Sequence, residues 1–243
     1  MNEKELKTSP KQRFFIILIA VIMLGSVIVS YIAIVMNGGK STTSTGSSSQ
    51  VDEAKIAEYE LAYNEKQAEF SAATKGDFDK FIKYKSEIKA YNETAANEAG
   101  VQTRDLEKGS GEKITEDNSN YLAYYVGWCA DESIFDSSFD DNKNPTAFAR
   151  ILDASMGMIE GWDIGVEGMS IGGVREITIP SELAYGDSME ICGGKNKPLR
   201  FMVMPMANEG ELGTLARELD QAYMRLQYAY YGVDYDDAIK NAE

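Results

Sequence analysis

The sequence predicts an α+β protein in which one β-rich domain lies between helical segments. Three observations predict this class. Residues 14–36 carry no charged side chain and are long enough to cross a membrane as a helix. Residues 101–208 contain short apolar runs separated by turn residues, a pattern typical of strands. Residues 51–98 and 209–243 repeat apolar side chains at helical spacing instead.

The composition of the 243 residues disfavours several functions. A net charge of −15 argues against nucleic-acid binding, which needs basic patches. The chain has no histidine and only two cysteines, so histidine-based catalysis is excluded and a metal site is disfavoured. We therefore expect no metal, no cofactor and no nucleic-acid partner.

The apolar run 14–36 is predicted to be a single transmembrane helix. Four basic residues lie in the segment 1–13, and only Lys40 closely follows the run, so the N-terminus should be cytoplasmic and the rest of the chain outside. The alternative is a cleaved signal peptide, whose apolar region would be about 7–15 residues with a small-x-small site after it. The run is longer and lacks that site, which favours an uncleaved signal anchor in the cell membrane.

The segment after the anchor is predicted to be a flexible linker followed by a helical stalk. Residues 37–50 are mostly Gly, Ser and Thr and offer few apolar side chains to bury. Helical spacing then predicts two helices, roughly 52–74 and 77–96, separated near Gly76. This stalk is either a spacer or dimerisation element, or a helix pair that rests on the domain.

The domain 101–208 is long enough for one hydrophobic core. A short helix is predicted over 159–166, because Trp162 and Val166 lie four residues apart on one face. Glycines 168, 172 and 173 supply a turn after it, since glycine tolerates positive φ. The predicted strands are 101–106, 120–129, 134–138, 145–152, 174–179 and 199–207.

Helix, turn, strand and an aromatic loop in this order resemble the C-terminal half of an FKBP-type peptidyl-prolyl cis-trans isomerase (rotamase), in a membrane-anchored bacterial form. The resemblance covers residues 101–208 and implies an FKBP-like, half-wrapped antiparallel sheet around a short helix. The matching residues are Ile159-x-Gly161-Trp162-Asp163, Gly168-Met169, Gly172-Gly173, Thr178-Ile179-Pro180, Ala184-Tyr185-Gly186, Tyr125-Val126-Gly127 and Phe135-Asp136-Ser137-Ser138.

The resemblance implies a site that needs no nucleophile. Rotation about a peptide bond breaks amide resonance at a barrier of ~18–20 kcal/mol. The twisted amide has a less polar carbonyl, so an apolar pocket favours it over the planar form. Trp162 would be the floor, the Ile159 N–H and Tyr185 hydroxyl would donate to the substrate, and Asp136 would orient Tyr125 or polarise the substrate. The implied set is Tyr125, Phe135, Asp136, Ile159, Trp162, Tyr185 and Phe201, with Met158, Thr146 and Ile191 contacting substrate.

Two departures from the family pattern concern the pocket wall and the loop over the substrate. Thr146 stands where many relatives have an aromatic residue, so the pocket loses one wall. The loop 186–198, which covers the substrate, keeps Ile191 and Pro198 but otherwise differs from the usual Ile-Pro-Pro ending. Substrate preference and macrolide binding are the properties that these departures affect.

The two cysteines and the C-terminal segment leave alternatives open. Cys129 and Cys192 form a disulfide, which the outer compartment permits, or are free thiols too far apart to meet. An apolar seam from Leu212 to Val233 predicts a helix that either forms a coiled coil with a partner or packs on its own chain. The second alternative is favoured, because few charges flank the seam. Asn208 and Glu211 have the spacing of a capping pair.

Together these inferences predict an isomerase at the outer face of the membrane, assisting the folding of exported proteins. Its substrates would be proline-containing polypeptides, and a homodimer through the stalk or the C-terminal helix is allowed. The alternative is a non-catalytic peptide-binding or chaperone module that uses the same apolar pocket.

Overall fold

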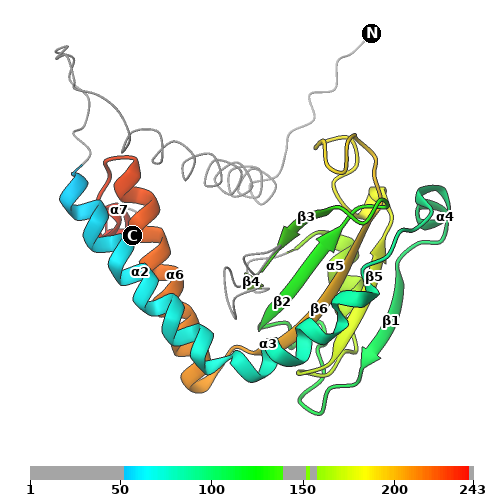
Figure 1. The fold of residues 1–243 in the computed structure, drawn as a ribbon, viewed down its shortest axis with the longest axis horizontal. Helices are drawn as coiled ribbons and strands as arrows, with labels where there is room; N and C mark the ends of the chain where they lie inside the picture. Colours follow the sequence, from blue (N-terminus) through cyan, green and yellow to red (C-terminus); the bar gives the residue numbers. More distant parts are fainter. Residues whose placement is uncertain (1–51, 139–151, 154–157, 241–243) are drawn as a thin grey trace, which may run out of the picture. The chain divides into compact units, whose positions relative to one another are not determined.

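The computed structural model describes residues 52–138, 152–153 and 158–240, and it has the predicted α+β architecture (Figure 1). The predicted cytoplasmic tail, transmembrane helix, linker and Thr146 lie outside these residues. Within the part of the chain that the structure describes, no helix is both long enough and apolar enough to span a membrane.

Six strands of the described chain form one antiparallel sheet. The sequence predicts such a sheet, and of the predicted strand 145–152 only Leu152 lies within the described residues. The strand order is β1-β5-β6-β2-β3, and β4 pairs with β2. The long neighbours β2 and β6 pair along their whole length, which puts β2 in the buried part of the sheet. The strands are β1 (Gln102–Glu107), β2 (Tyr121–Trp128), β3 (Ile134–Ser137), β4 (Leu152–Asp153), β5 (Val174–Ile179) and β6 (Leu199–Ala207).

One face of the sheet is covered by the short helix α5 (Glu160–Val166), which contacts β5. Gly161 and Gly165 lie four residues apart and face the strand. A Cβ on Gly161 would lie 2.2 Å from Ile179 Cγ2, and one on Gly165 would lie 2.4 Å from Ile177 Cγ2. The two glycines therefore let the helix approach the sheet closely enough to bury Trp162 completely.

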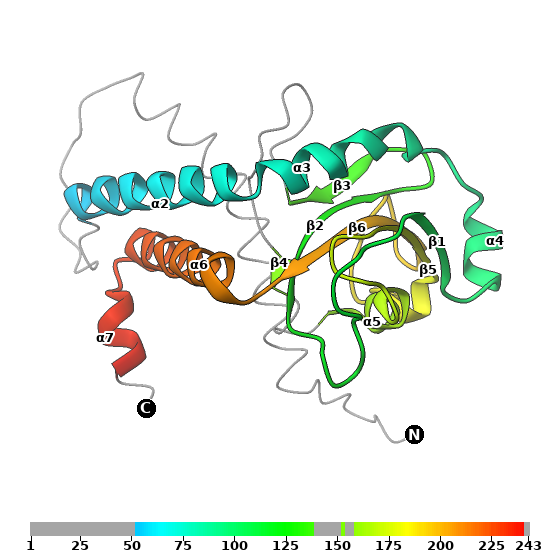
Figure 2. The same ribbon diagram turned by 90° about the horizontal axis from the view of Figure 1, so that it is seen from below.

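The opposite face packs against residues that precede the sheet in sequence, such as Phe70 and Phe78, and against Ala216 and Leu219, which follow it. Figure 2 shows α3 on this side. Helix α3 (Lys75–Phe81) packs Phe78 and Phe81 against Tyr124 of β2, with ring centroids 5.4 Å and 6.1 Å apart. The 3₁₀-helix η1 (Ile82–Glu87) and α4 (Glu93–Glu98) follow.

The prediction of one helix over 77–96 is wrong. After η1 the chain becomes extended, and it bonds to the end of β2 instead of to itself. The Lys89 carbonyl accepts from Trp128 Nε1 at 3.1 Å, and the Tyr91 N–H donates to the Ala130 carbonyl at 3.1 Å. The Asn92 side chain then accepts from the Ala95 N–H and begins α4. Part of the predicted stalk therefore belongs to the domain.

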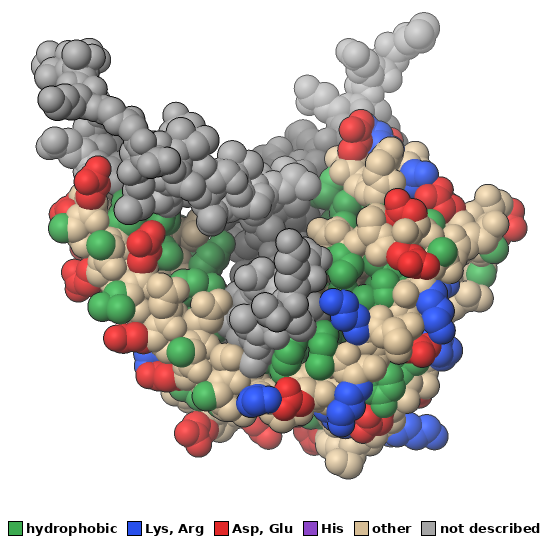
Figure 3. Space-filling model, in the orientation of Figure 1, with side chains coloured by type: hydrophobic (Ala, Val, Ile, Leu, Met, Phe, Trp, Pro, Cys, Tyr) green, Lys and Arg blue, Asp and Glu red, His purple; other side chains and the backbone are tan. Residues whose placement is uncertain are grey.

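The remaining helices form an antiparallel arm. α2 (Glu53–Ala73) lies beside α6 (Gly210–Tyr230), with Lys66 Nζ 2.8 Å from Glu218 Oε2 and the rings of Tyr63 and Tyr223 5.8 Å apart. Acidic side chains are scattered over this arm in Figure 3, whereas Lys and Arg lie mainly over the sheet. α7 (Tyr235–Lys240) follows α6.

The seam predicted on the C-terminal helix packs on its own chain, which is the favoured alternative. Leu219, Ala222, Leu226 and Ala229 are buried, and α6 makes its main contacts with α2. Val233, the last residue of the predicted seam, lies beyond α6 and is 45% exposed. The predicted capping pair is not formed. Glu209 is the residue before α6, no side chain caps the helix, and Asn208 Nδ2 donates to Asn120 Oδ1 at 2.8 Å.

Candidate active site

Strand β2 directs alternate side chains to the α5 face of the sheet. Tyr121, Ala123, Tyr125 and Gly127 occupy this face, since side chains in a strand alternate with a period of two. Tyr121, Ala123 and Tyr125 belong to the same buried cluster as Trp162 and Phe201. This alternation therefore places the Tyr125 side chain next to residues of α5 and β6.

Three aromatic rings meet beneath α5, and we call Tyr125, Trp162 and Phe201 the aromatic floor. The Trp162 ring lies edge-to-face with Tyr125 at 5.9 Å and 88°, and with Phe201 at 5.4 Å and 82°. These arrangements are the favoured geometry for aromatic pairs. Trp162 is 0% exposed, so the floor is formed before any ligand arrives.

Gly127 makes room for two of the rings. Phe135 of β3 packs edge-to-face on Phe201 at 5.5 Å. A Cβ on Gly127 would lie 2.6 Å from Phe135 Cζ and 2.8 Å from Phe201 Cε1. Only glycine therefore fits at this position of β2 without moving the aromatic pair.

The Asp136 carboxylate is fixed beside the floor. Tyr125 Oη donates to Asp136 Oδ2 at 2.7 Å, and the Ser137 N–H donates to Asp136 Oδ1 at 2.9 Å. The backbone of Tyr125 is tied to Ser138 as well, through its N–H to Ser138 Oγ at 2.8 Å. This geometry matches the first of the two roles predicted for Asp136, which is orienting Tyr125.

Five half-buried residues surround the floor, and we call Phe135, Met158, Ile159, Tyr185 and Ile191 the rim. All five pack against the cluster that contains the floor. Ile159 is the residue that precedes the first turn of α5, where backbone N–H groups have no partner within the helix. Tyr185 and Ile191 follow the 3₁₀-helix η3 (Ser181–Leu183). The structure thus brings together all the predicted site residues that it describes.

Tyr121, which the sequence prediction did not include, lies beside the aromatic floor. Trp162 Nε1 donates to Tyr121 Oη at 2.9 Å, and both side chains are buried. Burial raises the pKa of the Tyr121 phenol, so the hydroxyl stays neutral over the working pH range. The signal available in the sequence was the spacing of Tyr121 and Tyr125, which puts them on one face of a strand.

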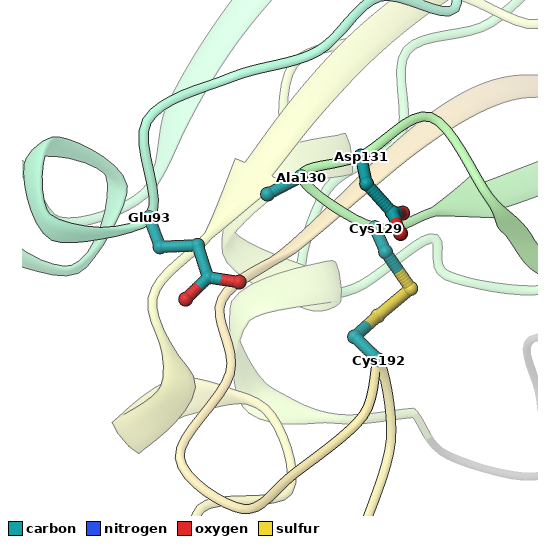
Figure 4. A pocket seen from close by; sticks show the side chains of 5 residues that line it. All are labelled: Glu93, Cys129, Ala130, Asp131 and Cys192. Carbon is teal, nitrogen blue, oxygen red and sulfur yellow. A yellow bond between two sulfur atoms is a disulfide. The ribbon is translucent and has the colours of Figure 1, made fainter.

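A disulfide joins Cys129, just after β2, to Cys192 in the loop that follows η3. The Cα atoms lie 5.4 Å apart. Beside the bond is a hollow of about 250 Å³ that Glu93 and Asp131 also line (Figure 4). The Ser133 hydroxyl and N–H bond to Asp131 and lower the pKa of its carboxyl. Of the two alternatives for the cysteines, the structure contains the bond, which ties the loop carrying Ile191 to the sheet.

A second hollow of about 250 Å³ lies near the start of α6, lined partly by Tyr121, Ile171 and Asn208. Within the described residues no group of three or more Cys, Asp or Glu side chains is arranged to hold a metal ion. Neither of these two hollows is lined by Tyr125, Trp162 or Phe201, so the aromatic floor is defined here by the packing of its rings.

An antiparallel sheet packed on a short helix, with a buried aromatic floor between them, is the architecture predicted for residues 101–208. A family model for FKBP-type peptidyl-prolyl cis-trans isomerase matches residues 111–204. The FK506-binding protein of Neisseria meningitidis serogroup B is 36% identical over 87 residues, covering 36% of this chain and 75% of the relative. The chain belongs to this family and is an FKBP-type peptidyl-prolyl cis-trans isomerase.

Two further similarities concern the same part of the chain. FK506-binding protein 4 of Emericella nidulans is 41% identical over 87 residues, which are 36% of this chain and only 17% of that relative. A crystal structure of a peptidyl-prolyl cis-trans isomerase from Pseudomonas syringae pv. tomato superposes with a TM-score of 0.35 and 23% identity, covering 55% of this chain and 94% of that one. The family match leaves α2, α3, α6 and α7 outside it.

The assembled residues suit prolyl isomerisation, because the reaction requires an apolar environment and no nucleophile. FKBP domains bind proline-containing peptides, and uncatalysed exchange of an X-Pro bond takes roughly tens to hundreds of seconds. An apolar site favours the twisted amide, whose carbonyl is less polar, over the planar one. Because the floor is already packed, little ordering is required at the moment of reaction.

Proposed function

We propose that this isomerase is a membrane-anchored, bacterial-type folding factor that assists exported proteins on the outer side of the cell membrane. The disulfide between Cys129 and Cys192 carries the proposal, because such bonds persist in oxidising compartments and are rare in the cytosol. The apolar run 14–36 and the basic residues before it support an anchor with a cytoplasmic N-terminus. Substrates would be X-Pro segments of chains that emerge from the membrane.

Cysteine labelling on intact cells tests the orientation. Ser47→Cys, in the linker, should react with a membrane-impermeant maleimide added from outside. Ser9→Cys, in the N-terminal tail, is the matched control and should react only after the cells are permeabilised. The native cysteines are bonded to each other and leave the background low. Labelling of Ser9→Cys but not Ser47→Cys in intact cells would contradict the proposed topology.

Exchange spectroscopy tests the activity and separates it from peptide holding. The full chain in a mild detergent should accelerate cis–trans exchange of a short X-Pro peptide, measured by NMR. Trp162→Ala and Tyr185→Phe should reduce this acceleration, since they alter the floor and the rim. Peptide binding by folded protein without any gain in rate would instead favour the non-catalytic chaperone module.

A homodimer stays a prediction. The seam of α6 is used against α2 within one chain, so a dimer would need other surfaces, such as the one that carries the exposed Leu61. Light scattering on the detergent-solubilised chain measures the number of protomers. Loss of a dimer in Leu61→Glu would assign the interface to the arm.

A further inference from the structure

The hydrogen bond beneath the aromatic floor points to a role for Tyr121. Tyr121 lies at the start of β2 and Trp162 lies in α5, and their side chains are 2% and 0% exposed. Trp162 Nε1 donates to Tyr121 Oη at 2.9 Å. We propose that Tyr121 is a positioning residue that fixes the plane of the Trp162 ring for the substrate proline. The inference rests on the isomerase activity and concerns a residue that acts through Trp162.

Packing alone leaves freedom in the indole ring. The contacts of Trp162 with Tyr125 and Phe201 are edge-to-face, and the torsion that tilts an aromatic ring about its bond to Cβ has broad minima. A hydrogen bond has a stronger directional preference, with the donor angle above about 150°. The bond to Tyr121 therefore restricts a tilt that the neighbouring rings permit.

The acceptor is itself well fixed. Tyr121 is paired with Ala207 across β2 and β6, and it packs in the same buried cluster as Trp162. Burial also keeps the phenol neutral, because it raises the pKa of Tyr121. A buried donor that loses its acceptor is costly, so removal of the Tyr121 hydroxyl should make the indole ring move toward another partner.

The same strand offers a matched control. Tyr124 is buried as deeply as Tyr121, at 1% exposure, but it faces the opposite side of the sheet. Its hydroxyl is also hydrogen-bonded, to Thr74 Oγ1 at 2.6 Å. Tyr121→Phe and Tyr124→Phe therefore each remove one buried hydroxyl from β2, and only the first touches the floor.

Kinetics of the full chain in a mild detergent test the proposal. Tyr121→Phe should lower kcat/KM for an X-Pro peptide about tenfold, which corresponds to ~1.4 kcal/mol, whereas Tyr124→Phe should stay within about twofold of wild type. In a Trp162→Phe background the floor has no N–H, so adding Tyr121→Phe should cause no further loss. The double-mutant cycle thereby isolates the coupling between the two residues.

Indole resonances give a readout that is independent of activity. The chain has two tryptophans, and Trp162→Phe identifies the N–H signal of Trp162 by removing it. Tyr121→Phe should shift that signal. The signal of Trp128, whose indole N–H donates to the Lys89 carbonyl, should stay unchanged. If Tyr121→Phe does not fold, hydrogen exchange in the wild type serves instead, and the Trp162 indole hydrogen should stay protected with and without peptide.

Several outcomes would overturn the inference. The first is an unchanged kcat/KM in a Tyr121→Phe variant whose Trp162 signal has shifted. The second is a fall in kcat/KM on adding Tyr121→Phe to Trp162→Phe that equals the fall it causes in the wild type. The third is fast exchange of the wild-type Trp162 indole hydrogen. A wild-type chain that does not catalyse exchange would overturn the isomerase assignment and this inference with it. An active wild type with any of the other three results overturns the role of Tyr121 alone.

Discussion

The two faces of strand β2 are filled in different ways. The face toward α5 carries Tyr121, Ala123, Tyr125 and Gly127, in which two tyrosines alternate with two small residues. The other face carries Leu122, Tyr124, Val126 and Trp128, and Phe78 and Phe81 close it. The small residues on the first face leave space that Phe135, Phe201 and Trp162 enter from three other elements.

The difference separates binding from stability. The α5 face ends in the half-buried rim. The opposite face, which we call the cover face, is buried against Phe70, Phe78, Phe81, Ala216 and Leu219. Changes on the cover face should therefore alter the free energy of unfolding and spare activity in the folded protein. Changes on the α5 face should alter activity beyond their effect on stability.

Phe81→Ala is the strongest test of the cover face. Phe81 is 0% exposed and stacks against Tyr124, so its truncation should cost ~3–5 kcal/mol of unfolding free energy. Urea unfolding followed by circular dichroism measures the loss. The kcat/KM of the folded protein at low temperature should stay within about twofold of wild type.

Leu61→Ala is the control for Phe81→Ala, because Leu61 is 61% exposed on α2. It should change stability by less than about 0.5 kcal/mol. A large fall in kcat/KM for folded Phe81→Ala would show that the cover face takes part in catalysis.

Gly127→Ala tests the α5 face of the same strand. The new methyl group would collide with Phe135 and Phe201, which should destabilise the protein by ~1–3 kcal/mol and displace both rings. We expect kcat/KM to fall about tenfold at a temperature where the variant is folded.

The matched glycine for this experiment is Gly76 in α3. A Cβ there meets no atom within 4 Å, and alanine favours the helix, so Gly76→Ala should stabilise by ~0.5–1 kcal/mol and leave activity unchanged. Equal activities of the two alanine variants would refute the claim that Gly127 reserves space for the rings.

Asp136→Asn probes the polar edge of the floor. The amide keeps an acceptor for Tyr125 Oη but removes the charge, and charge-assisted bonds are about twice as strong as neutral ones. We expect a loss of about threefold in kcat/KM, measured by the exchange assay.

On the cover face, Thr74→Val removes the partner of the Tyr124 hydroxyl and should lower stability without lowering kcat/KM. A fall in kcat/KM for Thr74→Val but not for Asp136→Asn would contradict the roles assigned to the two faces.

The sequence allowed the α5 face to be predicted because its residues lie in short, ordered motifs. Phe135 and Asp136 are adjacent, and Trp162 lies in a short helix that its spacing from Val166 predicts. Tyr121 was not predicted, because the residues of β2 that match the family begin at Tyr125. Its role depends on a bond to a residue 41 positions away, which strand alternation alone does not reveal.

The cover face could not be predicted for a related reason. Helical spacing over 77–96 was a correct observation, yet two tertiary hydrogen bonds hold this segment in an extended path. Trp128 Nε1 donates to the Lys89 carbonyl, and the Tyr91 N–H donates to the Ala130 carbonyl. The disulfide was likewise left open, since it depends on the distance between Cys129 and Cys192 in the folded chain. Local pattern predicted the elements, and contacts distant in sequence decided where α3 and η1 end.

Asp77 gives the smallest effect and a pH dependence for the cover face. Partial burial raises the pKa of its carboxyl, against an opposing attraction from Lys80. The folded state therefore holds the proton more tightly than the unfolded state, so stability falls as pH rises from about 4 through the folded pKa. Asp77→Asn removes this charge and should raise the melting temperature by on the order of 1 °C at pH 7, with no gain below about pH 4. The exposed Asp79→Asn is the control, and a pH-independent gain would show that the cause is not the buried charge.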